Sequence, residues 1–391
     1  MATVEVPGIA AGQASVFPPE EFERRQHAVR GHMEAAGIDV LIVTSPENIF
    51  YLSGQQTPGY STFQALVLPQ DGELVFIVRQ LELANFVANT FVANIAVYQD
   101  NDDPSEFLTN AVKDNGWAAK RVGIDMKGFF LPIAFYEGLR SGLGELHDGS
   151  GLVERERIVK SPLEQEKVRT AARYVDAAQS AAIAALPDAT NENDVVAAMV
   201  GAAIKAGGEY VGMEPLVSAG PRTGIPHHTW RRGPIRSGDN LILEPACCHD
   251  RYHAVSMRSA VVGTPNDEFL RMYNVAIEGL AATLDAVRPG NTCEDAHVAC
   301  QTVIDKAGLT DSFKKRVGYS IGIAFAPGWD EGPLLGMYFD VKVPLTPGMC
   351  FHIPVALRKW GAFTVGVSES IIVTETGYDV LGTIPRDLIR V

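Results

Sequence analysis

The chain has 391 residues, more than one ordinary domain needs, and 46% of them are hydrophobic while 20% are charged. This balance predicts two folded domains with full cores and excludes extensive disorder. The formal net charge of -14 leaves no excess of lysine and arginine to replace phosphate counterions, so binding to nucleic acid or to an anionic membrane is not expected.

No basic start followed by an apolar block is visible, and no apolar run reaches the roughly 18 residues of a membrane span. The five cysteines are scattered, without the paired spacing of a zinc site or a disulfide framework. We therefore expect reduced thiols in a cytoplasmic protein.

Strand and helix signals repeat along the first part of the chain. Apolar residues at helical spacing run over 20–36 and end at Gly37, and the turn sequence 69–73 between two apolar runs predicts a hairpin. The other expected elements are strands at 38–43, 65–68, 74–78, 95–98, 121–125 and near Val153, and a helix at 106–115. This pattern predicts an α/β domain over residues 1–157.

A strong helix start opens the second part. Ser161 can cap the helix, Pro162 suits its first position, and Glu164 completes a capping box. The expected elements are helices from 162 to 186, 193 to 206, 266 to 287 and 292 to 307, and strands at 214–218, 241–244, 254–262, 349–357 and 370–373. Helices grouped with antiparallel-looking strands predict an α+β domain over residues 158–391.

One carboxylate, Glu244, stands at the end of an apolar strand, where it is either paired structurally or faces a pocket. His227 precedes this strand. A histidine can move protons near neutral pH, and a partly buried carboxylate can hold a cation, accept a proton or attack an electrophilic carbon. Taken alone, His227 also fits an ordinary hydrogen-bonded histidine.

Two more polar residues interrupt apolar strands near the end of the chain, namely His352 and Glu369. An unpaired buried polar group costs roughly 1 to 3 kcal/mol, so each needs a partner. Either they pair with each other, or they line one cleft with His227 and Glu244.

Other candidates are less specific. Trp230 and Trp329 lie in loop-like segments and fit either core anchors or walls of a small-ligand pocket. His249 and His253 with Asp250 could suggest a metal cluster, but histidines four apart outside a helix do not face one ion.

These segments together resemble the creatinase, prolidase and methionine aminopeptidase superfamily, over nearly the whole chain. Its metal-free branch, and the ectoine hydrolases in particular, are the more similar. The matching segments are Pro226-His227, Thr229-Trp230, Arg251-Tyr252-His253, residues 289–295, Gly318-Tyr319, Gly348-Met349, Phe351-His352 and Glu369-Ser370-Ile371. The resemblance implies a creatinase-type N-terminal domain followed by a pita-bread catalytic domain.

Peptidases of that superfamily hold two metal ions through five side chains. The positions that match these ligands carry Glu244, Val255, Tyr319, Pro354 and Glu369. Valine and proline cannot bind a metal through their side chains, so we expect no catalytic metal and no cofactor.

The resemblance also implies a mechanism for a small-molecule substrate. Glu244 would add to the amidine carbon of a ring, and His227 would shuttle protons. The expected substrate-binding residues are Trp230, His253, His352, Glu369, Tyr319, Tyr60 and Phe63. The last two belong to a first-domain loop that would close the site of the partner subunit in a homodimer.

Three alternatives remain open: a creatinase-like amidinohydrolase, a residual metallopeptidase acting on Xaa-Pro dipeptides, and a binding protein without catalysis. Met257 stands where creatinase has a glutamate, which counts against creatine as substrate. Tyr338 stands where ectoine hydrolases carry an arginine that could hold a substrate carboxylate, and this favours a different small cyclic or N-substituted substrate.

Overall fold

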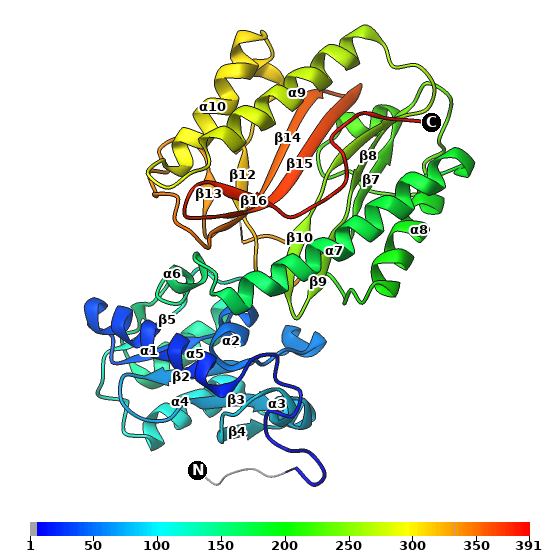
Figure 1. The fold of residues 1–391 in the computed structure, drawn as a ribbon. Helices are drawn as coiled ribbons and strands as arrows, with labels where there is room; N and C mark the ends of the chain where they lie inside the picture. The colour runs from blue at the N-terminus through cyan, green and yellow to red at the C-terminus, as the bar shows by residue number, and fades with distance from the viewer. Residues whose placement is uncertain (1–5, 332) are drawn as a thin grey trace. The chain divides into compact units, whose positions relative to one another are not determined.

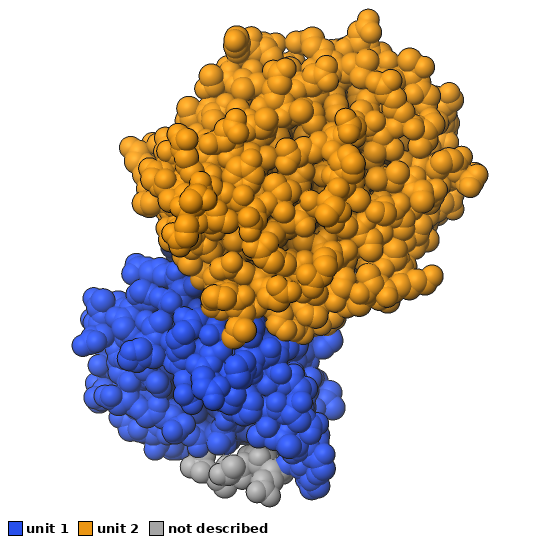
Figure 2. All heavy atoms as spheres, viewed as in Figure 1, with its two compact units in different colours: residues 1–157 blue, residues 158–391 orange. Residues whose placement is uncertain are grey.

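A computed structural model describes residues 6–331 and 333–391 (Figure 1). The chain divides into two compact units, 1–157 and 158–391 (Figure 2). Each unit has its own hydrophobic core. No described helix is long and apolar enough to cross a membrane.

The first unit is built on one six-stranded sheet with strand order β4-β3-β2-β1-β5-β6. The pairs β1–β2 and β2–β3 are antiparallel, and the other pairs are parallel. The elements are α1 (Pro19–Ala36), β1 (Val40–Val43), α2 (Pro46–Ser53), β2 (Ala65–Pro69), β3 (Val75–Arg79), α3 (Leu83–Asn89), β4 (Asn94–Tyr98), α4 (Pro104–Asp114), β5 (Val122–Ile124), α5 (Ile133–Leu143), β6 (His147–Asp148) and α6 (Glu154–Arg157).

The predicted hairpin is confirmed, since β2 and β3 pair antiparallel. The prediction of a strand near Val153 is wrong. Strand β6 ends at Asp148, and Val153 lies in the turn before α6. Gly151 adopts a φ of 86° there, a left-handed conformation that ends an extended run.

In its described residues, the second unit contains two pairs of α-helices and three sheets. Its elements are α7 (Pro162–Ala185), α8 (Glu192–Lys205), β7 (Leu216–Ala219), β8 (Asn240–Glu244), β9 (Ala246–His249), β10 (Tyr252–Val255), β11 (Arg258–Val261), α9 (Asp267–Ala286), α10 (Cys293–Lys306), β12 (Gly318–Ser320), β13 (Gly336–Met337), β14 (Cys350–Lys359), β15 (Phe363–Val373), β16 (Tyr378–Val380) and β17 (Ile389–Arg390). The single strand expected over 254–262 is in fact two strands, β10 and β11.

Helices α7 and α8 pack together and cover the sheet β17-β11-β8-β7, whereas α9 and α10 cover the sheet β13-β12-β14-β15-β16 (Figure 1). Apolar side chains of each helix pair and its sheet form a separate core. The uncovered faces of the two sheets meet each other, and the candidate site lies there.

The capping box at the start of α7 is confirmed. The Ser161 hydroxyl accepts a hydrogen bond from the Glu164 N–H at 3.4 Å, and the Glu164 carboxylate accepts one from the Ser161 N–H at 2.9 Å. Tyr252 of β10 also donates to this carboxylate at 2.8 Å. The same glutamate therefore fixes the helix start and links α7 to β10.

Candidate active site

Strand alternation places Glu244 between the two sheets. Leu241 and Leu243 of β8 belong to the core under α7 and α8, whereas Ile242 belongs to a small cluster with Ala356 of β14. Because side chains alternate along a strand, Glu244 lies on the same face of β8 as Ile242. Its carboxylate therefore points toward the sheet that carries β14.

Strand β14 presents a complementary face. Val355 belongs to the core under α9 and α10, whereas Ala356 faces β8. By the same alternation His352 and Arg358 lie on the face of β14 that is directed toward Glu244. The apolar cores on either side thus position three polar side chains between the sheets.

Glu244 is 5% exposed, and its carboxylate accepts no hydrogen bond from any residue that the structure describes. Burial raises the pKa of Glu244 above its ordinary value, and the positive charges of Lys315 and Arg358 act in the opposite direction. The carboxyl group can therefore exchange a proton closer to neutral pH than an exposed glutamate can.

Lys315 and Arg358 were not expected from the sequence. Lys315 lies in the loop before β12 and Arg358 near the end of β14, and both are partly exposed. Over residues 6–331 and 333–391, neither forms an ion pair with a carboxylate, and Nε of Arg358 is buried without a hydrogen-bond partner. Burial and the charge of Arg358 lower the pKa of Lys315, while Glu244 raises it.

A chain of hydrogen bonds runs through His352. Its Nδ1 lies 2.7 Å from the Tyr319 hydroxyl and its Nε2 lies 2.7 Å from the Ser368 hydroxyl. The Trp329 Nε1–H donates to the Tyr319 oxygen at 3.1 Å, and the Met257 N–H donates to the Ser368 oxygen at 2.6 Å. Burial lowers the pKa of His352 well below its usual value, so the ring is neutral.

Each hydrogen bond around His352 can be assigned a donor. Ser368 accepts from Met257 and donates to Nε2 of His352, so we assign the ring proton to Nδ1, which donates to Tyr319. The Tyr319 oxygen then accepts two hydrogen bonds, and its own proton is free. Burial, and next the charge of Glu244, raise the pKa of Tyr319 well above its usual value, which keeps the hydroxyl protonated beside Glu244.

Glu369 does not belong to this face, contrary to the expectation. The register pairs Ser368 with Pro354 and Glu369 with Ile353, so Ser368 is the β15 side chain beside the site. The Glu369 carboxylate accepts hydrogen bonds from Arg258 at 3.1 Å and from Arg386 at 2.8 Å. Its charge is neutralised there, and it does not pair with His352.

The ring of His253 is also held by the protein itself. Its Nδ1 lies 3.0 Å from the Arg251 carbonyl oxygen, and its Nε2 accepts a hydrogen bond from the Gly212 N–H at 3.1 Å. Burial lowers its pKa to about 3. Both ring nitrogens are occupied by backbone groups, so the ligand contact expected for His253 does not fit this geometry.

The segment between Gly224 and β8 carries the predicted proton shuttle. His227 is exposed and has a φ of 55°, and its ring makes no hydrogen bond with the described residues. His228 is partly buried, and its Nδ1 is buried without a partner. Trp230 packs against the core under α7 and α8, so its ring serves that core.

The first-unit residues expected to form a lid have different surroundings. Phe63 is buried in the core of its own unit, and its ring lies 4.5 Å from that of Phe135. Tyr60 lies in a short 3-10 helix (Pro58–Ser61) and makes an edge contact with Phe130 at 5.5 Å. Of the two, only Tyr60 keeps an accessible ring.

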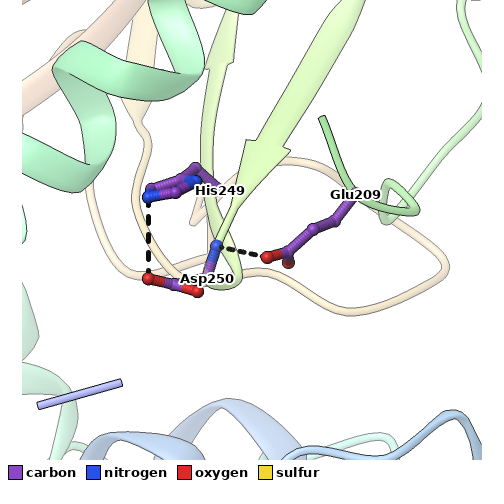
Figure 3. Close-up of side chains that lie close together, drawn as sticks. All are labelled: Glu209, His249 and Asp250. Carbon is purple, nitrogen blue, oxygen red and sulfur yellow. Dashed lines mark hydrogen bonds and ion pairs between the residues drawn. The ribbon is translucent and has the colours of Figure 1, made fainter. Parts of the chain in front are cut away.

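A possible metal-ligand set occurs elsewhere, at the β9–β10 turn, where Glu209, His249 and Asp250 converge (Figure 3). The Asp250 N–H donates to Glu209 at 3.1 Å, and His249 Nε2 lies 3.6 Å from the Asp250 carboxylate. Lys167 already pairs with Asp250 at 2.5 Å. The Lys167 ammonium therefore already neutralises one carboxylate of the cluster. We assign the cluster to stabilisation of the turn.

Both units of the chain match known protein families. Residues 166–375 match metallopeptidase family M24, and residues 25–159 match the creatinase/prolidase N-terminal domain. The chain belongs to metallopeptidase family M24. Its second unit is the pita-bread catalytic domain of that family, and its first unit is the creatinase-type N-terminal domain.

Relatives within family M24 align over nearly the full length. Ectoine hydrolase of Halomonas elongata is 30% identical over 394 aligned residues, which cover 95% of this chain and 98% of that protein. The dipeptidase PepE structure of Mycobacterium ulcerans is 26% identical, with a TM-score of 0.84 and coverage of 96% and 100%. Prolidase of Thermococcus sibiricus shares the fold, with 24% identity, a TM-score of 0.85 and coverage of 95% and 99%. These relatives are hydrolases, and this M24 chain is a hydrolase too.

Family M24 takes its name from metallopeptidases, but the residues of this site do not fit a metal pair. Over the described residues, Glu244 is the carboxylate on this face, the side chains of Val255 and Pro354 have no ligand atom, and Ser368 offers one hydroxyl oxygen. Divalent metal ions in such sites need several anionic oxygen ligands.

Proposed function

We propose that this M24 hydrolase opens a non-peptide C–N bond in a small cyclic or N-substituted amino acid without a metal ion, by ectoine-type ring opening. The observation that carries the proposal is the environment of Glu244, a single buried carboxylate beside two cations and a protonated tyrosine. Such a carboxylate is suited to covalent attack on a polarised carbon.

In the proposed reaction the carboxylate of Glu244 forms a bond to the amidine carbon, and one C–N bond of the ring breaks. The leaving nitrogen takes a proton from His227. Water then attacks the same carbon, gives a proton back to His227 and releases Glu244, so the product contains one added water. A protonated amidine is already electrophilic, and the step needs no Lewis acid.

The Tyr319 hydroxyl supports this chemistry as a hydrogen-bond donor next to Glu244. It is held by Trp329 and His352, so its direction is fixed before a substrate arrives. A donor that is already oriented stabilises developing negative charge without reorganisation. His352 and Trp329 act through Tyr319 as positioning residues.

The test is turnover of ectoine by chelator-treated enzyme, followed by mass spectrometry. Glu244→Gln and His227→Ala should each lower turnover at least about a hundredfold while the thermal unfolding midpoint stays close to that of the wild type. His228→Ala, one position along, serves as the matched control and should retain activity. Full activity in Glu244→Gln would refute the assignment.

A second candidate, cleavage of Xaa-Pro dipeptides, is favoured by the similarity to dipeptidase PepE and prolidase. It requires a metal, which the residues around Glu244 do not suit. Addition of manganese, cobalt or zinc to chelated enzyme followed by an assay with Ala-Pro distinguishes the two. Several-fold activation would favour the peptidase and remove the metal-independent proposal.

A further inference from the structure

The two cations beside Glu244 outnumber the carboxylate they act on. Glu369 does not restore the balance, because Arg258 and Arg386 already neutralise it. Lys315 and Arg358 have no carboxylate within ion-pair distance among the residues described. The site therefore carries one uncompensated positive charge when Glu244 is ionised and Lys315 is protonated.

Two neighbouring positive charges without a carboxylate partner are electrostatically unfavourable. Arg358 is mostly buried, and its Nε has no hydrogen-bond partner. Its positive charge repels that of Lys315. Burying an unpaired cation and two like charges together weakens the free protein. An anionic ligand would offset both costs, because a carboxylate can accept charge-assisted hydrogen bonds from a guanidinium and an ammonium at once.

We infer that Lys315 and Arg358 bind a carboxylate of the substrate, beside the carbon that Glu244 attacks. This inference rests on the proposed function for the reacting end of the substrate, and it names the other end. The substrate class is then a small amino-acid derivative that carries both an anionic carboxylate and a polarised C–N carbon.

The placement of the groups supports this division of roles. Arg358 lies on the face of β14 that is directed toward β8, and Lys315 is four residues ahead of Tyr319 at the start of β12. Glu244 and Tyr319 form the reacting side, and the two cations form the anchoring side. Tyr338 makes ring contacts with His297 and Phe339.

The test uses two ring compounds that contain no amidine, piperidine-2-carboxylate and piperidine-2-carboxamide. They share the ring and differ in the anionic group, so calorimetric dissociation constants isolate the carboxylate. Wild-type enzyme should bind the carboxylate more tightly than the carboxamide. Lys315→Met and Arg358→Met should each weaken carboxylate binding roughly ten- to a hundredfold and leave carboxamide binding within about twofold.

Each variant has a neighbour that serves as its control. Lys314→Met removes an exposed lysine that pairs with Asp311, and Lys359→Met removes one that pairs with Glu268. Neither should change binding of either compound. Lys315→Arg keeps the charge and should restore most of the preference for the carboxylate, which separates loss of charge from a disturbed fold.

Equal effects of Lys315→Met on the two compounds, or no effect on either, would overturn the inference and would assign Lys315 to the role of a counter-ion for Glu244. The binding comparison does not depend on turnover. Failure of the proposed reaction would leave the carboxylate preference intact, and failure of this inference would leave ectoine turnover to be judged by itself.

Discussion

The charge around Glu244 depends on residues that lie far from it in the sequence. Lys315 precedes β12 and Arg358 ends β14, and only the folded sheets bring their charges to the carboxylate. Glu244 itself was predictable, because a carboxylate at the end of an apolar strand stands out. Its cations were not, since a lysine in a loop and an arginine near a strand end resemble ordinary surface residues.

The effect of Lys315 on Glu244 can be measured through pH. Its cation opposes the rise in the pKa of Glu244. Lys315→Met should therefore raise this pKa further, and the acidic limb of the kcat/KM profile should move to higher pH, since attack requires the ionised carboxylate. The Lys314→Met profile should overlay the wild type, and an unmoved limb in Lys315→Met would contradict the coupling.

Tyr319→Phe tests the hydrogen-bond chain. Removing the hydroxyl leaves the Trp329 N–H and His352 Nδ1 without their partner in a buried place. The free energy of unfolding in urea should fall by about 1 to 3 kcal/mol. The same change at the exposed Tyr338 should have little effect, and equal stability of the two variants would argue against the chain.

His253 predicts how stability depends on pH. Its pKa in the folded protein is about 3, against an ordinary value near 6.5 for the unfolded chain. Below pH 6.5 the unfolded chain binds a proton that the folded one excludes, so stability is complete above this pH and is lost as pH falls. The slope contributed by His253 approaches about 1.4 kcal/mol per pH unit.

Urea unfolding at several pH values between 7.5 and 5 measures this slope. His253→Gln should show a shallower loss of stability than the wild type, whereas replacement of the exposed His27 by glutamine should leave the slope unchanged. Identical slopes in wild type and His253→Gln would mean that His253 titrates normally.

Helix caps and tight turns could be predicted from the sequence, because the interactions that form them are local. The capping box of α7 and the hairpin of β2 and β3 were predicted correctly, because caps and turns act over four or five residues. Helix α2 was missed, because nearly all of its residues are buried and it has only 8 residues.

The face of a strand was harder to predict than its existence. Strand β15 was expected, but Glu369 was placed in the cleft although the register gives that position to Ser368. A shift by one residue reverses the face, and no single sequence contains the register. His253 was misjudged for a similar reason, since its two backbone partners come from distant segments.

The loop that carries Trp329 is fixed by a buried ion pair. Nζ of Lys160 lies 2.6 Å from the Glu331 carboxylate and donates to the Ser320 hydroxyl at 3.1 Å. Lys160→Met would leave Glu331 buried without this cation, and the free energy of unfolding should fall by about 3 to 5 kcal/mol.

Urea unfolding followed by tryptophan fluorescence measures this effect. The exposed Lys359 provides the control for loss of a surface ion pair, whose replacement by methionine should cost less than about 1 kcal/mol. A loss as small in Lys160→Met would show that other groups hold Glu331.

For the whole molecule, the expected homodimer is a separate proposal. Sedimentation equilibrium of the full chain should give twice the monomer mass. In this proposal Tyr60 is the lid residue with a partly exposed ring, because Phe63 fills the core of its own unit. A monomer with full activity would exclude any contribution of a partner to the site.

In the proposed reaction Glu244 acts as a nucleophile without a metal. The most direct measurement is mass spectrometry of ectoine incubated with chelator-treated enzyme that has been shown by elemental analysis to contain no transition metal. The wild type should convert ectoine to a product that contains one added water, and Glu244→Gln should give no conversion. Conversion that appears only after a metal is restored would contradict this proposal.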